Sequence, residues 1–190
     1  MPLPGRPTPS NWITRWAGQL PPGARVLDLA CGNGRHLRWL AAHGFQATGI
    51  DRDTTALTDL AGQAEILQGD LEAGPWPLAG RQFEAVVVTH YLWRPRWAEL
   101  MACVAPGGWL LYETFSCHQA LIGKPSRPDF LLQPGELLAR CLGWQIVAYE
   151  DGFLAQPDRF VQRIAAVRPG GPAPGVPARH PLPFSQLSQG

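Results

Sequence analysis

The sequence predicts an α/β protein with a doubly wound, mostly parallel sheet of seven strands that ends in an antiparallel hairpin. Three observations predict this fold. Short, β-branched apolar runs alternate with helical patterns along the middle of the chain, which is typical of a parallel sheet covered on both faces. A glycine-rich segment directly follows the first run, and the last two runs have no helix-length segment between them. A parallel crossover needs a dozen or more residues, so these last two strands should pair antiparallel.

The elements are expected in a regular order. Five strands are predicted at residues 25–29, 46–50, 65–68, 84–89 and 108–114. Helices are predicted at residues 34–43, 53–61, 96–104 and 134–141. The hairpin should pair residues 144–150 with 160–168, across a connection that contains Gly152 and Pro157.

Length and composition favour one domain between two proline-rich ends. A chain of 190 residues with 45% hydrophobic content can bury one core. We expect a proline-rich, partly helical lead-in over residues 1–22, the domain over 23–168, and a tail over 169–190. The tail has no apolar period, so it is expected to be extended or disordered.

Composition also restricts the class of partner. Lys plus Arg number 16 against 15 for Asp plus Glu, so the chain lacks the strong positive charge that draws proteins onto nucleic acid. The sequence has no apolar run long enough to cross a membrane. Its four cysteines show neither disulfide nor zinc-ligand spacing. We therefore expect a cytoplasmic protein, a monomer or a homodimer, that acts on a small molecule without a metal, a membrane or nucleic acid.

A candidate ligand-binding loop follows the first predicted strand, in RVLDLACGNGRH. Gly32 and Gly34 allow a tight turn and a close approach of the backbone to a ligand, and the following helix presents free amide groups. Such a loop is typical of nucleoside cofactors, although glycine-rich turns of this kind also arise for steric reasons alone.

Carboxylates near three successive strand ends strengthen this interpretation. Asp28 precedes the loop, Asp51 follows the second strand and Asp70 follows the third. In an open α/β sheet, ligands bind beyond the carboxyl ends of the strands. An acid after the second strand can accept both ribose hydroxyls, and one after the third can accept from an adenine amine. Asp28 would favour a cationic group on the ligand.

An NAD(P)-dependent oxidoreductase is the alternative that uses a similar loop and acid. The dinucleotide fingerprint counted from Gly32 would require glycine at position 37, which is Leu37. The negative charge of Asp28 also has no role in binding the pyrophosphate of a dinucleotide. Arg52 keeps this alternative open, because an arginine there could accept a 2′-phosphate.

Taken together, these segments resemble the class I S-adenosylmethionine-dependent methyltransferase family, within a Rossmann-like fold. The resemblance rests on VLDLACGNG, GID at 49–51, GD at 69–70, FEAVVVTHYL at 83–92 and PGGWLLYETF at 106–115. It covers roughly residues 23–168, and within the family it is nearest to the short tellurite-resistance-type and thiopurine-type small-molecule enzymes. The segment THYL also differs from the Asn-Pro-Pro-aromatic turn of enzymes that methylate amino groups of flipped bases.

The resemblance implies S-adenosylmethionine as cofactor and assigns the residues around it. It implies that Ala30, Cys31, Gly32, Asn33 and Gly34 hold the methionine part, with Asp28 beside them. It implies that Asp51 with Arg52 lies at the ribose, that Asp70 with Leu71 lies at the adenine, and that Thr89 to Tyr91 face the transferable methyl group.

The sequence does not assign a catalytic residue. Methyl transfer mainly requires alignment of the acceptor and exclusion of water, so no base is obligatory. His90 and Tyr91 are candidates by position only, and packing or a structural hydrogen bond explains each equally well. Lys124 and Arg127 could meet an anionic substrate or simply be solvated. Because no strong catalytic group is evident, a cofactor-binding module without turnover is a second hypothesis.

Overall fold

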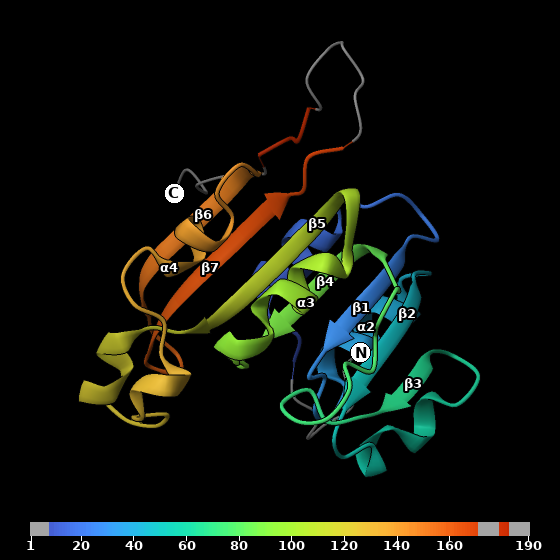
Figure 1. Cartoon of the computed structure of the whole chain (residues 1–190), viewed down its shortest axis with the longest axis horizontal. Helices are drawn as coiled ribbons and strands as arrows, with labels where there is room; N and C mark the ends of the chain where they lie inside the picture. Colours follow the sequence, from blue (N-terminus) through green and yellow to red (C-terminus); the bar gives the residue numbers. More distant parts are fainter. Residues whose placement is uncertain (1–7, 171–178, 183–190) are drawn as a thin grey trace, which may run out of the picture.

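The computed structural model describes residues 8–170 and 179–182. Its centre is a seven-stranded sheet of order β3-β2-β1-β4-β5-β7-β6 (Figure 1). The strands are β1 Arg25–Leu29, β2 Gln46–Asp51, β3 Glu65–Gln68, β4 Phe83–Thr89, β5 Val104–Phe115, β6 Gln145–Leu154 and β7 Arg159–Val167. The first five are mutually parallel, and β7 pairs antiparallel with both β5 and β6. The predicted fold and its terminal hairpin are confirmed.

Helices cover both faces of the sheet, as the continuous apolar strands require. One face packs against α1 Asn11–Ala17, α2 Arg35–Ala42 and the 3-10 helix η1 Thr55–Leu60. The other face packs against α3 Trp97–Ala102, α4 Glu136–Arg140 and the loop that contains Leu71 and Leu78. Three further 3-10 turns are η2 Arg94–Arg96, η3 Cys117–Leu121 and η4 Pro128–Phe130.

Two elements differ from the sequence prediction. The α-helix expected at residues 53–61 is wrong, because this segment forms only the 3-10 helix η1. The Asx turn of Asp53, which accepts from the Thr55 N–H at 3.0 Å and the Thr55 hydroxyl at 2.7 Å, satisfies these groups locally. Strand β5 begins at Val104, four residues earlier than expected, because the segment from Val104 already pairs with Phe83 of β4.

The N-terminal segment contributes to the core. Ser10 caps α1 by accepting from the Trp12 N–H at 3.2 Å. Trp12, Ile13 and Trp16 are buried. The Trp16 ring stacks on Trp109 of β5 with a centroid distance of 6.4 Å, and the Trp12 ring lies edge-on to Trp16 at 5.7 Å. The lead-in therefore packs α1 on one face of the sheet, and the Ser10 hydroxyl donates to Glu113 near the carboxyl end of β5.

The predicted tail falls mainly outside the described residues. Within 179–182, the ring of His180 lies edge-on to Trp109, with ring centroids 4.7 Å apart. Among residues 8–170 and 179–182, no helix has both the length and the apolar character needed to cross a bilayer.

Candidate functional site

The candidate site is a crevice at the carboxyl ends of β1 to β4, where the strand order reverses beside β1. It has a cavity of about 260 Å³. The lining residues come from four strand ends and are Ala30, Asp51, Arg52, Gly69, Asp70, Leu71, Glu72, His90 and Tyr91. Seven of the residues predicted from the sequence are thus brought to one cavity.

The loop after β1 is shaped by left-handed backbone conformations. Ala30, Gly32 and Gly34 have φ angles of 55°, 53° and 72°. The Gly34 N–H donates to the Cys31 carbonyl at 2.8 Å, and α2 begins at the next residue with no side-chain cap. A Cβ on Gly34 would lie 2.5 Å from Leu57 Cδ2, so glycine is needed here for packing as well as for φ.

Cys31 and Asn33 hold the loop in place by different means. The Cys31 N–H donates to the Ile50 carbonyl at 3.0 Å, and its buried side chain packs against β2, where burial raises the pKa of the thiol. Asn33 is exposed, and its carbonyl accepts from the Arg38 guanidinium. Cys31 therefore contributes its backbone and packing, with its thiol kept neutral.

Asp28 is the least satisfied charged group at the site. Its side chain is 0% exposed, and neither carboxylate oxygen has a hydrogen-bond partner among the described residues. Burial raises the pKa of Asp28 to about 7, against weaker opposing effects of the nearby Leu37 N–H and the Arg35 guanidinium. A buried carboxylate without a partner is costly, so this position fits a ligand that brings a positive charge.

The other two acids are held in fixed orientations by backbone N–H groups. Asp51 accepts from the Gly32 N–H at 2.7 Å and from the Asp53 N–H at 3.1 Å. Asp70 uses one oxygen, Oδ1, to accept from the N–H groups of Glu72 at 2.8 Å and Ala73 at 3.2 Å. The second oxygen of Asp70 is left for a ligand, and Asp51 ties the glycine loop to the end of β2.

Thr89, His90 and Tyr91 leave β4 in different directions. Thr89 is buried, and its hydroxyl lies 3.4 Å from Nδ1 of His36 on α2, so it faces away from the cavity lining. His90 has a left-handed φ of 54° and stacks on Phe115 with a centroid distance of 4.8 Å. Two of the three non-glycine residues with positive φ in the described chain, Ala30 and His90, line the crevice, and such strain is often concentrated at functional sites.

The two catalytic candidates have distinct protonation properties. Packing around His90 and the Arg35 guanidinium lower the pKa of His90 to about 4, so its imidazole is neutral at pH 7. Burial raises the pKa of the Tyr91 phenol above its ordinary value, and the nearby carboxylates of Glu72 and Asp70 add to this effect. The Tyr91 hydroxyl has no hydrogen-bond partner in the described structure, which leaves it free to donate to a ligand.

Three charged residues outside the predicted site set, Arg35, Glu113 and Arg159, affect the pKa of His90, which lines the crevice. Glu113 is 0% exposed on β5 and lies 4.0 Å from Arg159 of β7. The one available signal was an acid inside the otherwise uncharged strand segment WLLYETF. By contrast, Arg127 is exposed and pairs with Asp129 at 3.0 Å.

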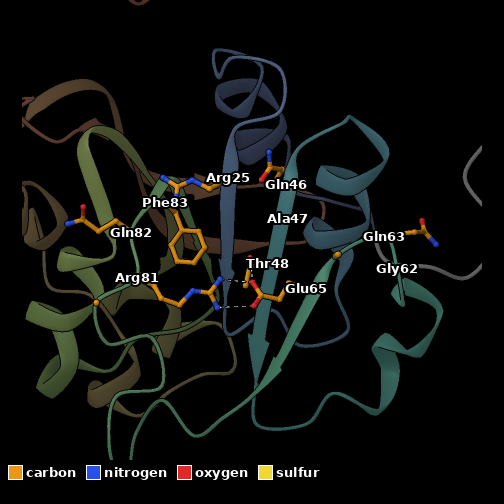
Figure 2. Close-up of a pocket in the computed structure, with 12 residues that line it drawn as sticks. Arg25, Gln46, Ala47, Thr48, Gly62, Gln63, Glu65, Arg81, Gln82 and Phe83 are labelled. Carbon is orange, nitrogen blue, oxygen red and sulfur yellow. Dashed lines mark hydrogen bonds and ion pairs between the residues drawn. The ribbon is translucent and has the colours of Figure 1, made fainter.

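A larger hollow lies at the opposite, amino-terminal ends of the strands (Figure 2). Its volume is about 640 Å³, and its charged residues are already paired. Arg81 contacts Glu65 at 2.5 Å (Figure 2). Arg25 contacts Glu84 at 2.6 Å. Because ligands of open α/β sheets bind at the carboxyl ends, the smaller crevice is the candidate site.

The sheet order, the terminal antiparallel hairpin and the three acids near a glycine loop are the arrangement expected of a nucleoside-binding protein with the methyltransferase fold. Comparison with known proteins agrees with this, because residues 26–108 match the methyltransferase domain family. This match includes the glycine loop and the ends of β1 to β4, so the part of the chain that forms the candidate site is similar to methyltransferase domains. The family match does not support the oxidoreductase alternative.

Curated relatives share part of this chain. A ubiquinone biosynthesis O-methyltransferase of Burkholderia thailandensis is 34% identical over 117 residues, which is 56% of this chain and 50% of that protein. A tRNA U34 carboxymethyltransferase of Methylococcus capsulatus is 34% identical over 104 residues, 48% of this chain and 32% of that protein. The chain spans about half the length of the first relative and a third of the second.

Solved structures share the fold over most of the chain. TehB from Haemophilus influenzae superposes with a TM-score of 0.68 at 19% identity, covering 82% of this chain and 61% of TehB. An S-adenosylmethionine-dependent methyltransferase from Methanosarcina mazei superposes with a TM-score of 0.64 at 17% identity, covering 86% and 99%. At these identities the likeness concerns the fold alone.

Proposed function

We propose that this chain binds S-adenosylmethionine in the crevice and catalyses methyl transfer to a small-molecule acceptor. The observation that carries the proposal is the buried, unpartnered carboxylate of Asp28 beside a glycine loop, with Asp51 and Asp70 presented at neighbouring strand ends. A ligand with a cationic amino-acid part and a nucleoside part satisfies all three acids together.

The residues present fit the cofactor part by part. Asp28 and the backbone of the loop from Ala30 to Gly34 would hold the methionine part. Asp51 would accept from the ribose hydroxyls, and Asp70 from the adenine amine, beside the buried side chain of Leu71. When bound, S-adenosylmethionine would supply a methyl group, carried on a positively charged sulfur, for transfer to a lone pair of the acceptor.

A small acceptor is supported by charge. The chain carries a formal charge of only +1, without the positive excess that draws proteins onto nucleic acid. The relative named for tRNA modification is larger than this chain, and it matches over only a third of its own length. The four cysteines are free thiols, as expected for a protein of the reducing cytoplasm, where we place it.

We propose that His90 and Tyr91 face the reacting atoms and position the acceptor. Because the pKa of His90 is about 4, its neutral imidazole would be an inefficient base at pH 7. We therefore expect His90→Ala to lower kcat/KM by roughly tenfold, which is a smaller loss than the removal of a general base causes. The pH–rate profile between pH 5.5 and 8 should keep its shape, and a limb near pH 6 to 7 that disappears in the variant would instead identify His90 as the base.

Tyr91→Phe separates packing from ligand binding. The hydroxyl makes no hydrogen bond in the described structure, so its removal should leave the unfolding temperature of the free protein unchanged or slightly higher. Any loss of cofactor or acceptor affinity would then report a direct bond to the ligand. If both variants retain full turnover and affinity, neither residue serves the reaction.

Calorimetric titrations with S-adenosylmethionine and with NADPH test the class of cofactor. Release of S-adenosylhomocysteine is then measured across thiol, selenium, tellurium and carboxylate acceptors. We expect binding of S-adenosylmethionine and turnover with at least one acceptor. Tight NADPH binding without S-adenosylmethionine binding would overturn the proposal, and cofactor binding without any turnover would favour the non-catalytic module.

A further inference from the structure

A buried histidine on α2 connects the N-terminal segment to the end of β4. His36 is 1% exposed, and its Nε2 accepts from the Ser10 N–H at 3.0 Å. Its Nδ1 lies 3.4 Å from the hydroxyl of Thr89, the last residue of β4. One side chain on α2 therefore joins two segments that are 26 and 53 residues away in the sequence.

The hydrogen bonds determine which nitrogen of His36 carries the proton. Burial and the nearby Arg35 guanidinium lower the pKa of His36 to about 3, so its imidazole is neutral at pH 7. Nε2 accepts from a backbone N–H, so the proton of the neutral imidazole must be on Nδ1. The Nδ1–H group therefore donates to the Thr89 hydroxyl oxygen. His36 is held in one tautomer by a partner at each ring nitrogen.

A second contact of Ser10 reaches the same strand end. The Ser10 hydroxyl donates to Oε2 of the fully buried Glu113 at 2.9 Å. Glu113 lies opposite Thr89 in the register of β4 and β5, and its carbonyl accepts from the His90 N–H at 3.0 Å. The side chains of Ser10, His36, Thr89 and Glu113, which are each at most 9% exposed, thus form one buried network around the end of β4.

This network adjoins a strained residue that lines the crevice. His90 has a φ of 54°, which residues other than glycine rarely adopt, and it lines the cavity. Such a conformation persists only where the surrounding structure determines it. The His90 N–H is bonded to Glu113, and the His90 ring stacks on Phe115 with a centroid distance of 4.8 Å. The preceding residue, Thr89, is tied to His36. Contacts on both sides of the backbone therefore fix the turn at His90.

We propose that His36 is a positioning residue for methyl transfer, which holds Thr89 and thereby keeps the His90 turn in the conformation that presents His90 to the acceptor. This inference rests on the proposed function, in which His90 faces the reacting atoms. His36 is not among the described residues that line the cavity, so it acts through Thr89. The N-terminal segment then belongs to the site, because Ser10 anchors the other ring nitrogen of His36.

NMR of the imidazole nitrogens in the full chain tests the network without cofactor or acceptor. We expect His36 to stay neutral, with its proton on Nδ1, from pH 5 to 8. Thr89→Val removes the oxygen that accepts from His36 at nearly constant volume, so it should shift the His36 Nδ1 and His90 backbone resonances. Thr48→Val, which removes a buried strand hydroxyl bonded to Glu65 at 2.9 Å, is the matched control and should shift neither. A proton on Nε2 of His36, or a ring that titrates in this pH range, overturns the proposal.

Two substitutions of His36 separate its two bonds. The amide nitrogen of His36→Asn can replace Nδ1–H and donate to Thr89, whereas the amide oxygen of His36→Gln can replace Nε2 and accept from Ser10. Each variant loses one bond, so similar drops in unfolding temperature are expected. Turnover is measured with the best acceptor among the thiol, selenium, tellurium and carboxylate compounds. We expect kcat to fall about tenfold in His36→Gln and Thr89→Val, but less than about threefold in His36→Asn.

The Kd of S-adenosylhomocysteine separates positioning from other effects. It should change less than about twofold in all three variants, because neither His36 nor Thr89 is among the described residues that line the cavity. A loss of affinity that matches the loss of kcat would show that His36 supports the glycine loop instead, and overturns the proposal. Equal kcat in the two His36 variants, or full kcat in Thr89→Val, also overturns it.

The same measurements distinguish this proposal from the proposed function. If the wild type binds no S-adenosylhomocysteine, the proposed function fails and the positioning role fails with it. If the wild type binds the cofactor and turns over, but kcat does not respond to the link between His36 and Thr89, only the positioning role fails. If the His36 variants do not fold, kcat, Kd and the NMR shifts of Thr89→Val decide the question.

Discussion

The Asp28→Asn substitution is expected to weaken S-adenosylmethionine binding about a hundredfold while making the free protein more stable at pH 8. The carboxylate is fully buried without a hydrogen-bond partner in the described structure, so its charge is a cost until a cation arrives. Losing one partner of a buried charge pair typically costs 2 to 5 kcal/mol, and about 2.7 kcal/mol corresponds to a hundredfold change in Kd.

The sign of the stability change follows from the raised pKa. In the unfolded chain Asp28 ionises near 3.8, and in the folded protein near 7. Between these values the folded state holds the extra proton, so the free energy of unfolding falls as pH rises from about 4 to 7, by a few kcal/mol in total. Asparagine removes this loss but buries an amide, so we expect a net gain of roughly 1 to 2 kcal/mol at pH 8 and none at pH 5.

Urea unfolding at the two pH values measures the gain, and calorimetry measures the Kd. In the wild type, binding should strengthen from pH 6 to 7.5 with release of a proton, because the bound cation keeps Asp28 ionised. Asp158→Asn, on the exposed connection between β6 and β7, is the control and should change neither quantity. Unchanged affinity in Asp28→Asn would remove Asp28 from the cofactor site, and with it the main support for the proposed function.

Local sequence signals were sufficient for the sheet. Each parallel strand is a short apolar run, and period and composition identify such runs without tertiary information. The prediction of an α-helix at 53–61 was wrong because the spacing of Leu57 and Leu60, which both face the core, is equally compatible with a 3-10 helix. The polar side chains before it favour a turn through their local hydrogen bonds, and the pattern of apolar residues does not reveal this.

The cofactor side of the site was also readable from the sequence. Parallel strands bring their carboxyl ends to one edge, so Asp51 and Asp70 could be placed together by strand counting alone. The contact between Glu113 and Arg159 could not be predicted in this way, because it depends on β7 inserting between β5 and β6 and on the direction in which each side chain leaves its strand. Neither spacing nor composition encodes a contact across 46 or more residues.

Glu113→Gln is expected to destabilise the protein by about 3 kcal/mol. The variant keeps the volume of the side chain but removes the buried negative charge that Arg163 and Arg159 share. Breaking a buried ion pair from one side typically costs 3 to 5 kcal/mol, because the remaining charge is left uncompensated. Thermal and urea unfolding measure the loss. Glu150→Gln removes the other, 46% exposed partner of Arg163, and should cost less than about 1 kcal/mol.

Added anions distinguish the loss of charge from a general loss of packing. With Glu113 neutral, Arg159 and Arg163 lack their shared counter-charge, so sulfate at low millimolar concentration should raise the unfolding temperature of Glu113→Gln more than that of the wild type. The double substitution Glu113→Gln with Arg163→Met should be less destabilised than the sum of the two single changes, with a coupling energy of roughly 1 to 3 kcal/mol. Additive losses and equal responses to sulfate would show that Glu113 acts only by filling space and that its charge does not stabilise the two arginines.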